Sequence, residues 1–195
     1  VYKALFGEKE EVVRCGGKKD DTSGKGLVHI YCGDGKGKTT TSVGLTVRAA
    51  GSGKKVLFYQ FLKNNSSSER SILEKQLGIN VVSGKELQKF TFQMNEEELK
   101  ELRDYNNEML DKLFEMAKDY DMLVLDESVY SIDKDLLDEA KLIEHLEKKP
   151  FALEVVLSGR NPSERLIDHA DYVSEIRKVK HPFDQGISSR IGIEM

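Results

Sequence analysis

A run of glycines and lysines between an apolar stretch and a helical pattern has the composition of a phosphate-binding loop. Its residues are Gly33, Asp34, Gly35, Lys36, Gly37, Lys38, Thr39 and Thr40. Glycines let the backbone curl so that successive N–H groups point at phosphate oxygens, and the following helix presents its unsatisfied N–H groups to the same anion. Lys38 would reach the terminal phosphate oxygens, and the Thr39 hydroxyl would ligate Mg²⁺. These residues predict a site for the triphosphate of a nucleotide.

The loop is a variant of the pattern G-x-x-x-x-G-K-[ST]. Counting back from Gly37, the first glycine of that pattern falls on Cys32, whereas Gly33 stands one place later and Lys36 lies inside the loop. A surface turn rich in Gly and Lys is the alternative interpretation. The position of the loop, after an apolar run and before a helix, favours the phosphate site.

Two acidic residues, Asp126 and Glu127, follow the apolar run at 122–125. Parallel α/β sheets place their sites at the carboxyl ends of the strands, and Mg²⁺ prefers one or two carboxylates together with phosphate oxygens and water. The pair therefore predicts a magnesium site with Thr39, although two polar residues that simply end a strand are the alternative. Arg160 follows another strand and is a candidate for contacting phosphate or for a local salt bridge.

Phe90 and Phe92 lie between a polar stretch and the start of a long helical pattern. If the chain is extended there, two aromatic side chains at this spacing share one face. Core packing in a short strand remains the alternative interpretation of the pair.

The bulk composition is that of one soluble domain. The chain has 195 residues, a formal net charge of −4 and two cysteines. This charge gives no global basic field for nucleic acid, two cysteines are too few for a disulfide framework, and no apolar run is long enough to span a membrane. We expect a cytoplasmic protein with an N-terminal arm and linker at 1–25, where residues 2–15 could form a hairpin, and a main domain at 26–195.

Short apolar runs alternate with helical patterns through the main domain. Strands are expected at 27–32, 56–61, 79–82, 122–125, 153–157 and 172–176, and helices at 39–50, 69–77, from 95 onward, at 136–146 and just after 161. Gly51 is expected to end the first helix, and Asn161 to cap the last. Because strands that alternate with helices pair in parallel through right-handed crossovers, the pattern predicts a three-layer α/β/α sandwich with a mostly parallel sheet.

Taken together, these motifs resemble one family, the P-loop (RecA-like) ATP:corrinoid adenosyltransferases, which act on cob(I)alamin or cob(I)yrinic acid a,c-diamide. The resemblance runs from about Leu27 to the C-terminus. It is carried by the loop at 33–40, by Gln60-Phe61-Leu62-Lys63, by Leu125-Asp126-Glu127, by Ser158-Gly159-Arg160-Asn161, and by the tail Val179-Lys180-His181-Pro182-Phe183-Asp184-Gln185-Gly186-Ile187. The tail is the most specific part, since ordinary P-loop enzymes have nothing like it.

The resemblance implies transfer of the 5′-deoxyadenosyl group of ATP to the cobalt(I) of a corrinoid, with release of triphosphate. Lys38, Thr39 and Glu127 would be catalytic, with Mg²⁺ held by Thr39, Asp126 and Glu127. Phe90 and Phe92 would contact the lower face of the corrinoid, with Phe92 standing where the family has Trp. The family also implies a homodimer and a flavoprotein reductant. A P-loop ATPase or small-molecule kinase, and a nucleotide-binding regulatory module, are the alternatives.

Overall fold

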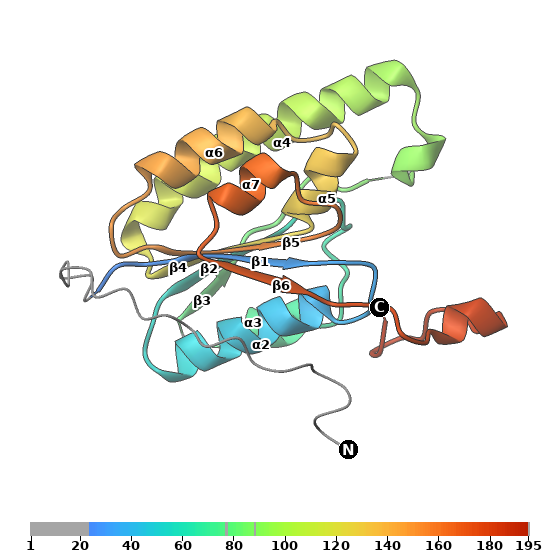
Figure 1. The fold of residues 1–195 in the computed structure, drawn as a ribbon, viewed down its shortest axis with the longest axis horizontal. Helices are drawn as coiled ribbons and strands as arrows, with labels where there is room; N and C mark the ends of the chain where they lie inside the picture. The colour runs from blue at the N-terminus through green and yellow to red at the C-terminus, as the bar shows by residue number, and fades with distance from the viewer. Residues whose placement is uncertain (1–23, 77, 88, 195) are drawn as a thin grey trace, which may run out of the picture.

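A single sheet of parallel strands organises the protein, which was analysed as a computed structural model describing residues 24–76, 78–87 and 89–194. The strand order is β3-β2-β4-β5-β1-β6, and every pairing is parallel (Figure 1). The strands are β1 (Val28–Cys32), β2 (Val56–Gln60), β3 (Ile79–Val81), β4 (Met122–Asp126), β5 (Glu154–Ser158) and β6 (Tyr172–Glu175). The hairpin expected at 2–15 lies outside the described residues.

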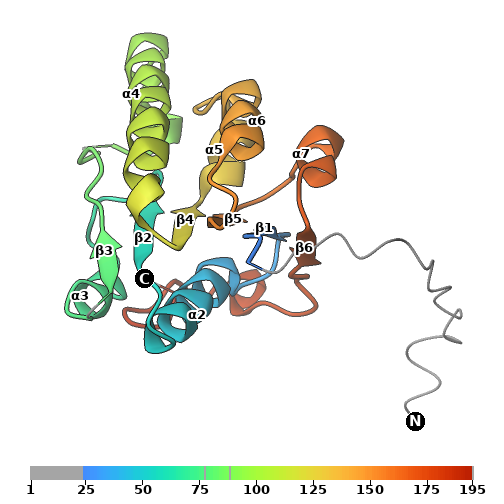
Figure 2. The ribbon, with the colours of Figure 1, turned by 90° about the vertical axis from the view of Figure 1, so that its left-hand side faces the viewer.

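Helices cover both faces of the sheet and make the three layers (Figure 2). One face carries α2 (Lys38–Gly51) and α3 (Arg70–Leu73), and the other carries α4 (Glu96–Met116), α5 (Ser128–Asp133), α6 (Glu139–Lys148) and α7 (Glu164–Asp168). Short 3₁₀ turns lie at Thr91–Gln93, Ala117–Asp119 and Pro182–Gln185. The predicted three-layer α/β/α sandwich with a parallel sheet is confirmed.

The central strands are buried on both sides, because successive side chains of a strand point to opposite faces. Leu57 and Leu123 belong to the core on the side of α4 and α6, together with Leu110 of α4. Phe58 and Val124, one position further along the same strands, belong to the core on the side of α2 and α3. This double burial explains why β2 and β4 appear in the sequence as continuous apolar runs.

The predicted helices differ from the observed ones in several places. The helix expected at 69–77 shortens to α3, and α5 was not predicted. Gly51 is the last residue of α2, where the sequence predicted the end of this helix, and the left-handed glycine comes two residues later, at Gly53. The expected cap of the last helix is also wrong. Asn161 has φ 52° and donates its side-chain N–H to Asp133, whereas Ser163 caps α7 by accepting from Leu166 N.

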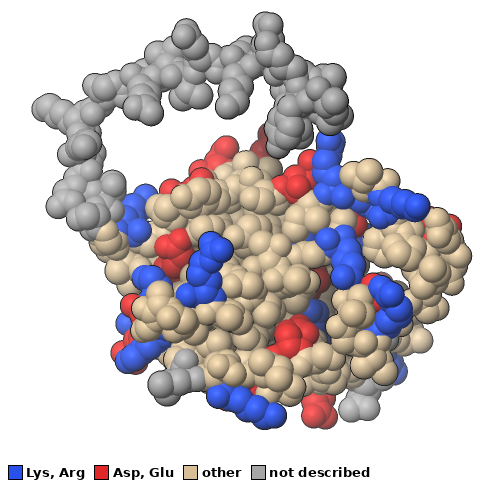
Figure 3. Space-filling model, turned by 90° about the horizontal axis from the view of Figure 1, so that it is seen from below, with Lys and Arg blue, Asp and Glu red and all other residues tan. Residues whose placement is uncertain are grey.

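Acidic and basic side chains are both scattered over the face seen from the side of α2 (Figure 3). Among the described residues, no helix is long and apolar enough to cross a bilayer.

Candidate functional site

The glycine-rich loop at 33–40 joins the end of β1 to the start of α2 and packs against the segment that follows β6. The Gly35 N–H donates to the Ile176 carbonyl at 2.8 Å. A Cβ on Gly35 would lie 2.7 Å from that oxygen, and one on Gly33, where φ is 107°, would lie 2.4 Å from it. Only glycine allows so close an approach of two backbones. These two glycines therefore fix the loop against the sheet, and Gly37, with φ 126°, turns the chain into α2.

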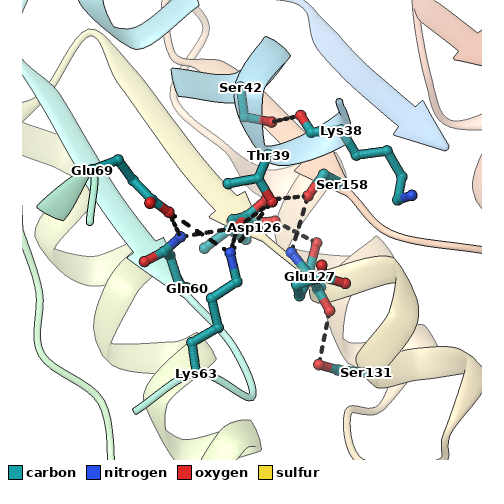
Figure 4. Close-up of polar contacts among 12 residues, drawn as sticks. Lys38, Thr39, Ser42, Gln60, Lys63, Glu69, Asp126, Glu127, Ser131 and Ser158 are labelled. Atoms are coloured by element: carbon teal, nitrogen blue, oxygen red, sulfur yellow. Dashed lines mark hydrogen bonds and ion pairs between the residues drawn. The ribbon is translucent and has the colours of Figure 1, made fainter. Parts of the chain in front are cut away.

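Lys38 is the first residue of α2, and its ammonium group folds back over the loop (Figure 4). Its Nζ donates to the Gly35 carbonyl at 2.9 Å, and the residue is 9% exposed. Burial and the neighbouring Arg160 lower the pKa of Lys38, while the nearby acids Glu127, Asp34 and Asp126 act in the opposite direction. A desolvated cation beside loop amides is suited to binding an anion.

Asp126 ends β4 as a fully buried carboxylate with hydrogen-bond donors on both oxygens. Its Oδ1 accepts from Ser158 Oγ at 2.5 Å. Its Oδ2 accepts from Thr39 Oγ1 at 3.1 Å and from Gln60 Nε2 at 3.1 Å. The predicted partners Thr39 and Asp126 thus lie together, and strands on both sides of β4 hold the carboxylate between them.

Lys63 supplies the positive charge beside this carboxylate (Figure 4). Its Nζ lies 3.0 Å from Asp126 Oδ2, 3.3 Å from Thr39 Oγ1 and 3.8 Å from Glu69 Oε1. Burial acts to lower the pKa of Lys63, but the charge and hydrogen bond of Asp126, with Glu69 and Glu127 behind them, raise it overall. The ammonium form of Lys63 is therefore part of the site.

Glu127 is held in an unusual backbone conformation next to Asp126. Its φ is 60° and its ψ 13°, in the left-handed region that non-glycine residues seldom adopt. The Glu127 N–H donates to Ser158 Oγ at 3.0 Å. Burial, followed by the Asp126 charge, raises the pKa of the Glu127 carboxyl against the opposing effects of Lys63, Lys38 and Arg160. Strained backbone of this kind is concentrated at functional sites.

The oxygen donors of this cluster fit a small divalent cation. Thr39 offers a hydroxyl and Asp126 a carboxylate oxygen 3.1 Å away from it, with the Glu127 carboxyl beside them. Mg²⁺ takes one or two protein carboxylates and fills its remaining positions with phosphate oxygens and water. In the described part of the chain, no group of three or more His, Cys, Asp or Glu side chains has a metal-binding arrangement. The cluster thus offers at most two carboxyl groups and one hydroxyl to such an ion.

The other predicted site residues lie in the loop, at the start of α2 and after β5. The Asp34 carboxylate accepts from the Lys178 N–H at 2.9 Å and so ties the loop to the C-terminal tail. Lys36 and Thr40 are exposed. Arg160 is exposed at the end of β5 and near enough to influence the pKa values of Lys38 and Glu127.

Phe90 and Phe92 lie around the 3₁₀ turn before α4, not in a strand. Their rings stack with centroids 5.4 Å apart and planes inclined by 8°, and the residues are 70% and 82% exposed. The interpretation of this pair as core residues of a short strand is wrong, because both side chains are largely exposed in the described fold.

Sequence reasoning did not assign roles to Gln60, Lys63, Glu69 and Ser158. Three of them follow or end strands next to β4, since Gln60 pairs with Asp126 in register and Ser158 ends β5 on the other side. The available signal was the rule that carboxyl ends of neighbouring parallel strands meet at one edge. Applying it required the strand order, which the sequence does not state.

The sequence of the chain is similar to one family of known proteins. Residues 24–195 match the model described as "ATP:corrinoid adenosyltransferase BtuR/CobO/CobP". The chain is 33% identical over 175 residues to a corrinoid adenosyltransferase of Escherichia coli K12, covering 87% of this chain and 86% of that one. It is 34% identical to the corrinoid adenosyltransferase CobA of Salmonella typhimurium LT2, again covering 87% of this chain and 86% of that one. Among solved structures, it is similar to a KaiC-like protein of Pyrococcus horikoshii OT3, with TM-score 0.48, 18% identity, and 79% and 73% of the two chains covered.

Proposed function

The chain belongs to the ATP:corrinoid adenosyltransferase family, whose members adenosylate corrinoids with ATP, and we propose that its own transfer reaction takes place at the cluster around Lys38, Thr39 and Asp126. In this reaction the cobalt(I) of the corrinoid substrate attacks the 5′-carbon of ATP. The C5′–O bond breaks, and its electron pair leaves with the triphosphate. No side chain has to act as the nucleophile.

The observation that carries the proposal is the meeting of a buried ammonium, a glycine loop and a buried carboxylate at one sheet edge. Lys38 Nζ lies 2.9 Å from the loop carbonyl of Gly35, and Thr39 joins α2 to Asp126. Fixed donors in a site that excludes water stabilise developing charge without reorganising. The loop amides and Lys38 would thus hold the triphosphate and stabilise the charge that it gains as it leaves.

We propose that Mg²⁺ binds with the nucleotide through Thr39, Asp126 and Glu127. The ion would supply positive charge to the triphosphate oxygens. Ser158 supports this arrangement because it contacts both acids, through the Asp126 carboxylate and the Glu127 N–H. A divalent cation beside the Glu127 carboxyl would act to lower its raised pKa.

We propose that Phe90 and Phe92 contact the lower face of the corrin ring. Two stacked and exposed rings form an apolar surface of the kind that a large flat ligand covers. Phe92 offers a smaller area than the Trp of the family pattern, so its displacement of a lower axial ligand would be weaker.

Product analysis tests the transfer reaction directly. The protein is incubated with ATP, Mg²⁺ and chemically reduced cobalamin. We expect a light-sensitive cobalt–carbon product and intact triphosphate in equal amounts. Orthophosphate as the main phosphorus product, formed without corrinoid, would instead indicate a P-loop ATPase or kinase, and nucleotide binding without turnover would indicate a regulatory module.

The resemblance to the family further leads us to propose a cytoplasmic homodimer that receives electrons from a flavoprotein. Light scattering on the purified protein tests the dimer. Replacement of the chemical reductant by a reduced flavoprotein tests the electron source.

A further inference from the structure

Lys63 occupies a place in the site that a metal ion would also need. The residue follows β2, beyond Gln60, which pairs with Asp126 across the sheet. Its ammonium lies 3.0 Å from Asp126 Oδ2 and 3.3 Å from Thr39 Oγ1 (Figure 4). Asp126 and Thr39 are two of the three residues to which the proposed function assigns Mg²⁺.

The charge of Asp126 explains why a cation stays there. Asp126 is fully buried, and an ionised carboxylate without water needs an opposite charge nearby. Among the Lys and Arg side chains in the described ranges, Lys63 is the one within ion-pair distance of Asp126. Thr39, Gln60 and Ser158 contribute neutral hydrogen bonds but no charge.

An ammonium and a magnesium ion cannot share this position, because both are cations that need the same lone pairs. Lys63 also has a second carboxylate within reach, since Glu69 Oε1 lies 3.8 Å from its Nζ. The side chain is 27% exposed, so it has a route toward solvent. The ammonium can therefore leave Asp126 and keep a charged partner.

We propose that Lys63 is a placeholder cation, which balances the charge of Asp126 in the nucleotide-free protein and is displaced from it when a divalent cation arrives with the triphosphate. This inference rests on the proposed function for the identity of the metal ligands. The consequence is an order of binding, in which the metal enters with ATP because without phosphate oxygens it cannot compete with the tethered ammonium.

Metal binding to the nucleotide-free protein tests the inference, with Mn²⁺ as the probe in place of Mg²⁺. We expect Lys63→Met to bind Mn²⁺ at least tenfold more tightly than the unsubstituted protein, as measured by titration calorimetry and by the loss of the free-ion electron paramagnetic resonance signal. Lys63→Arg keeps the charge and should bind as weakly as the unsubstituted protein. Lys85→Met is the matched control, because Lys85 lines a surface pocket together with Lys63 but pairs with Glu101 instead of Asp126.

Thermal unfolding gives a second readout if Lys63→Met is less stable. Millimolar Mg²⁺ should raise the melting temperature of Lys63→Met and leave that of the unsubstituted protein and of Lys85→Met unchanged. Equal Mn²⁺ affinity in Lys63→Met and the unsubstituted protein, or tight nucleotide-free binding by the latter, would overturn the inference. Since neither measurement includes nucleotide or corrinoid, a failure here is distinct from a failure of the transfer reaction, which product analysis reports.

Discussion

Ser158 is the residue whose removal tests the organisation of the site most directly. Its hydroxyl is 1% exposed and makes two contacts, donating to Asp126 Oδ1 at 2.5 Å and accepting from the Glu127 N–H at 3.0 Å. Ser158→Ala deletes one oxygen, introduces no clash, and leaves a buried carboxylate oxygen and a partly buried N–H without this partner.

The magnitude follows from these two contacts. A buried polar group that loses its partner costs about 1–3 kcal/mol. Two such groups predict a loss of about 2–6 kcal/mol in the free energy of unfolding. For a domain of this size, 3 kcal/mol corresponds to a fall of about 6–12 °C in melting temperature. Adenosylation should fall as well, because the Glu127 N–H then loses a contact that holds a left-handed backbone.

Urea denaturation followed by circular dichroism measures this loss, with Ser42→Ala as the matched control. Ser42 is also fully buried, but its hydroxyl only donates back to the Lys38 carbonyl within α2 at 3.2 Å. Such a bond adds little to a helix, so the control should lose less than about 1 kcal/mol. If the two variants lose the same amount, the argument that Ser158 joins the two acids is refuted.

Four further substitutions probe the loop, the acids and the aromatic pair. Lys38→Ala should slow adenosylation by about a hundredfold or more while the circular dichroism spectrum stays native. Lys54→Ala, at an exposed position outside the loop, is the control and should keep full activity. Near-normal turnover of Lys38→Ala would remove this lysine from the mechanism. Gly35→Ala should weaken ATP binding in calorimetry, because its Cβ would lie 2.7 Å from a backbone oxygen, and unchanged affinity would contradict that crowding. Phe92→Ala should slow product formation from cobalt(II) more than from cobalt(I); equal slowing would reject the contact with the axial face. Burial and the neighbouring carboxylate raise the pKa of Glu127, so its ionised form destabilises the fold above the unfolded-state pKa. Glu127→Gln should therefore raise the melting temperature at pH 8 and have little effect at pH 4. A gain of the same size at both pH values would argue against the raised pKa.

The alternation of elements was predictable because it depends on local patterns. Continuous apolar runs predicted β2 and β4, and the helical pattern from 95 onward predicted α4. The structure shows that Asn95 and Glu98 make both reciprocal hydrogen bonds of a capping box at its start. The prediction of a helix start was wrong where more than one polar residue before the helix was able to act as its cap. Asn161 and Ser163 both precede α7, and only the contact of Asn161 with Asp133 on α5 decides that Ser163 is the cap.

The sequence alone predicted the glycine-rich loop and the acid at the end of β4, because Gly33 to Thr39 follow one another in the chain and Asp126 ends a run that must be buried. Only the tertiary structure decided which side chains surround Asp126. Gln60 lies 66 positions before it and Ser158 lies 32 positions after it, and the strand order places both beside it. The same order brings Lys63 to the carboxylate. Strand pairing is a non-local outcome of burying both faces of the sheet, so no spacing within the chain encodes these contacts.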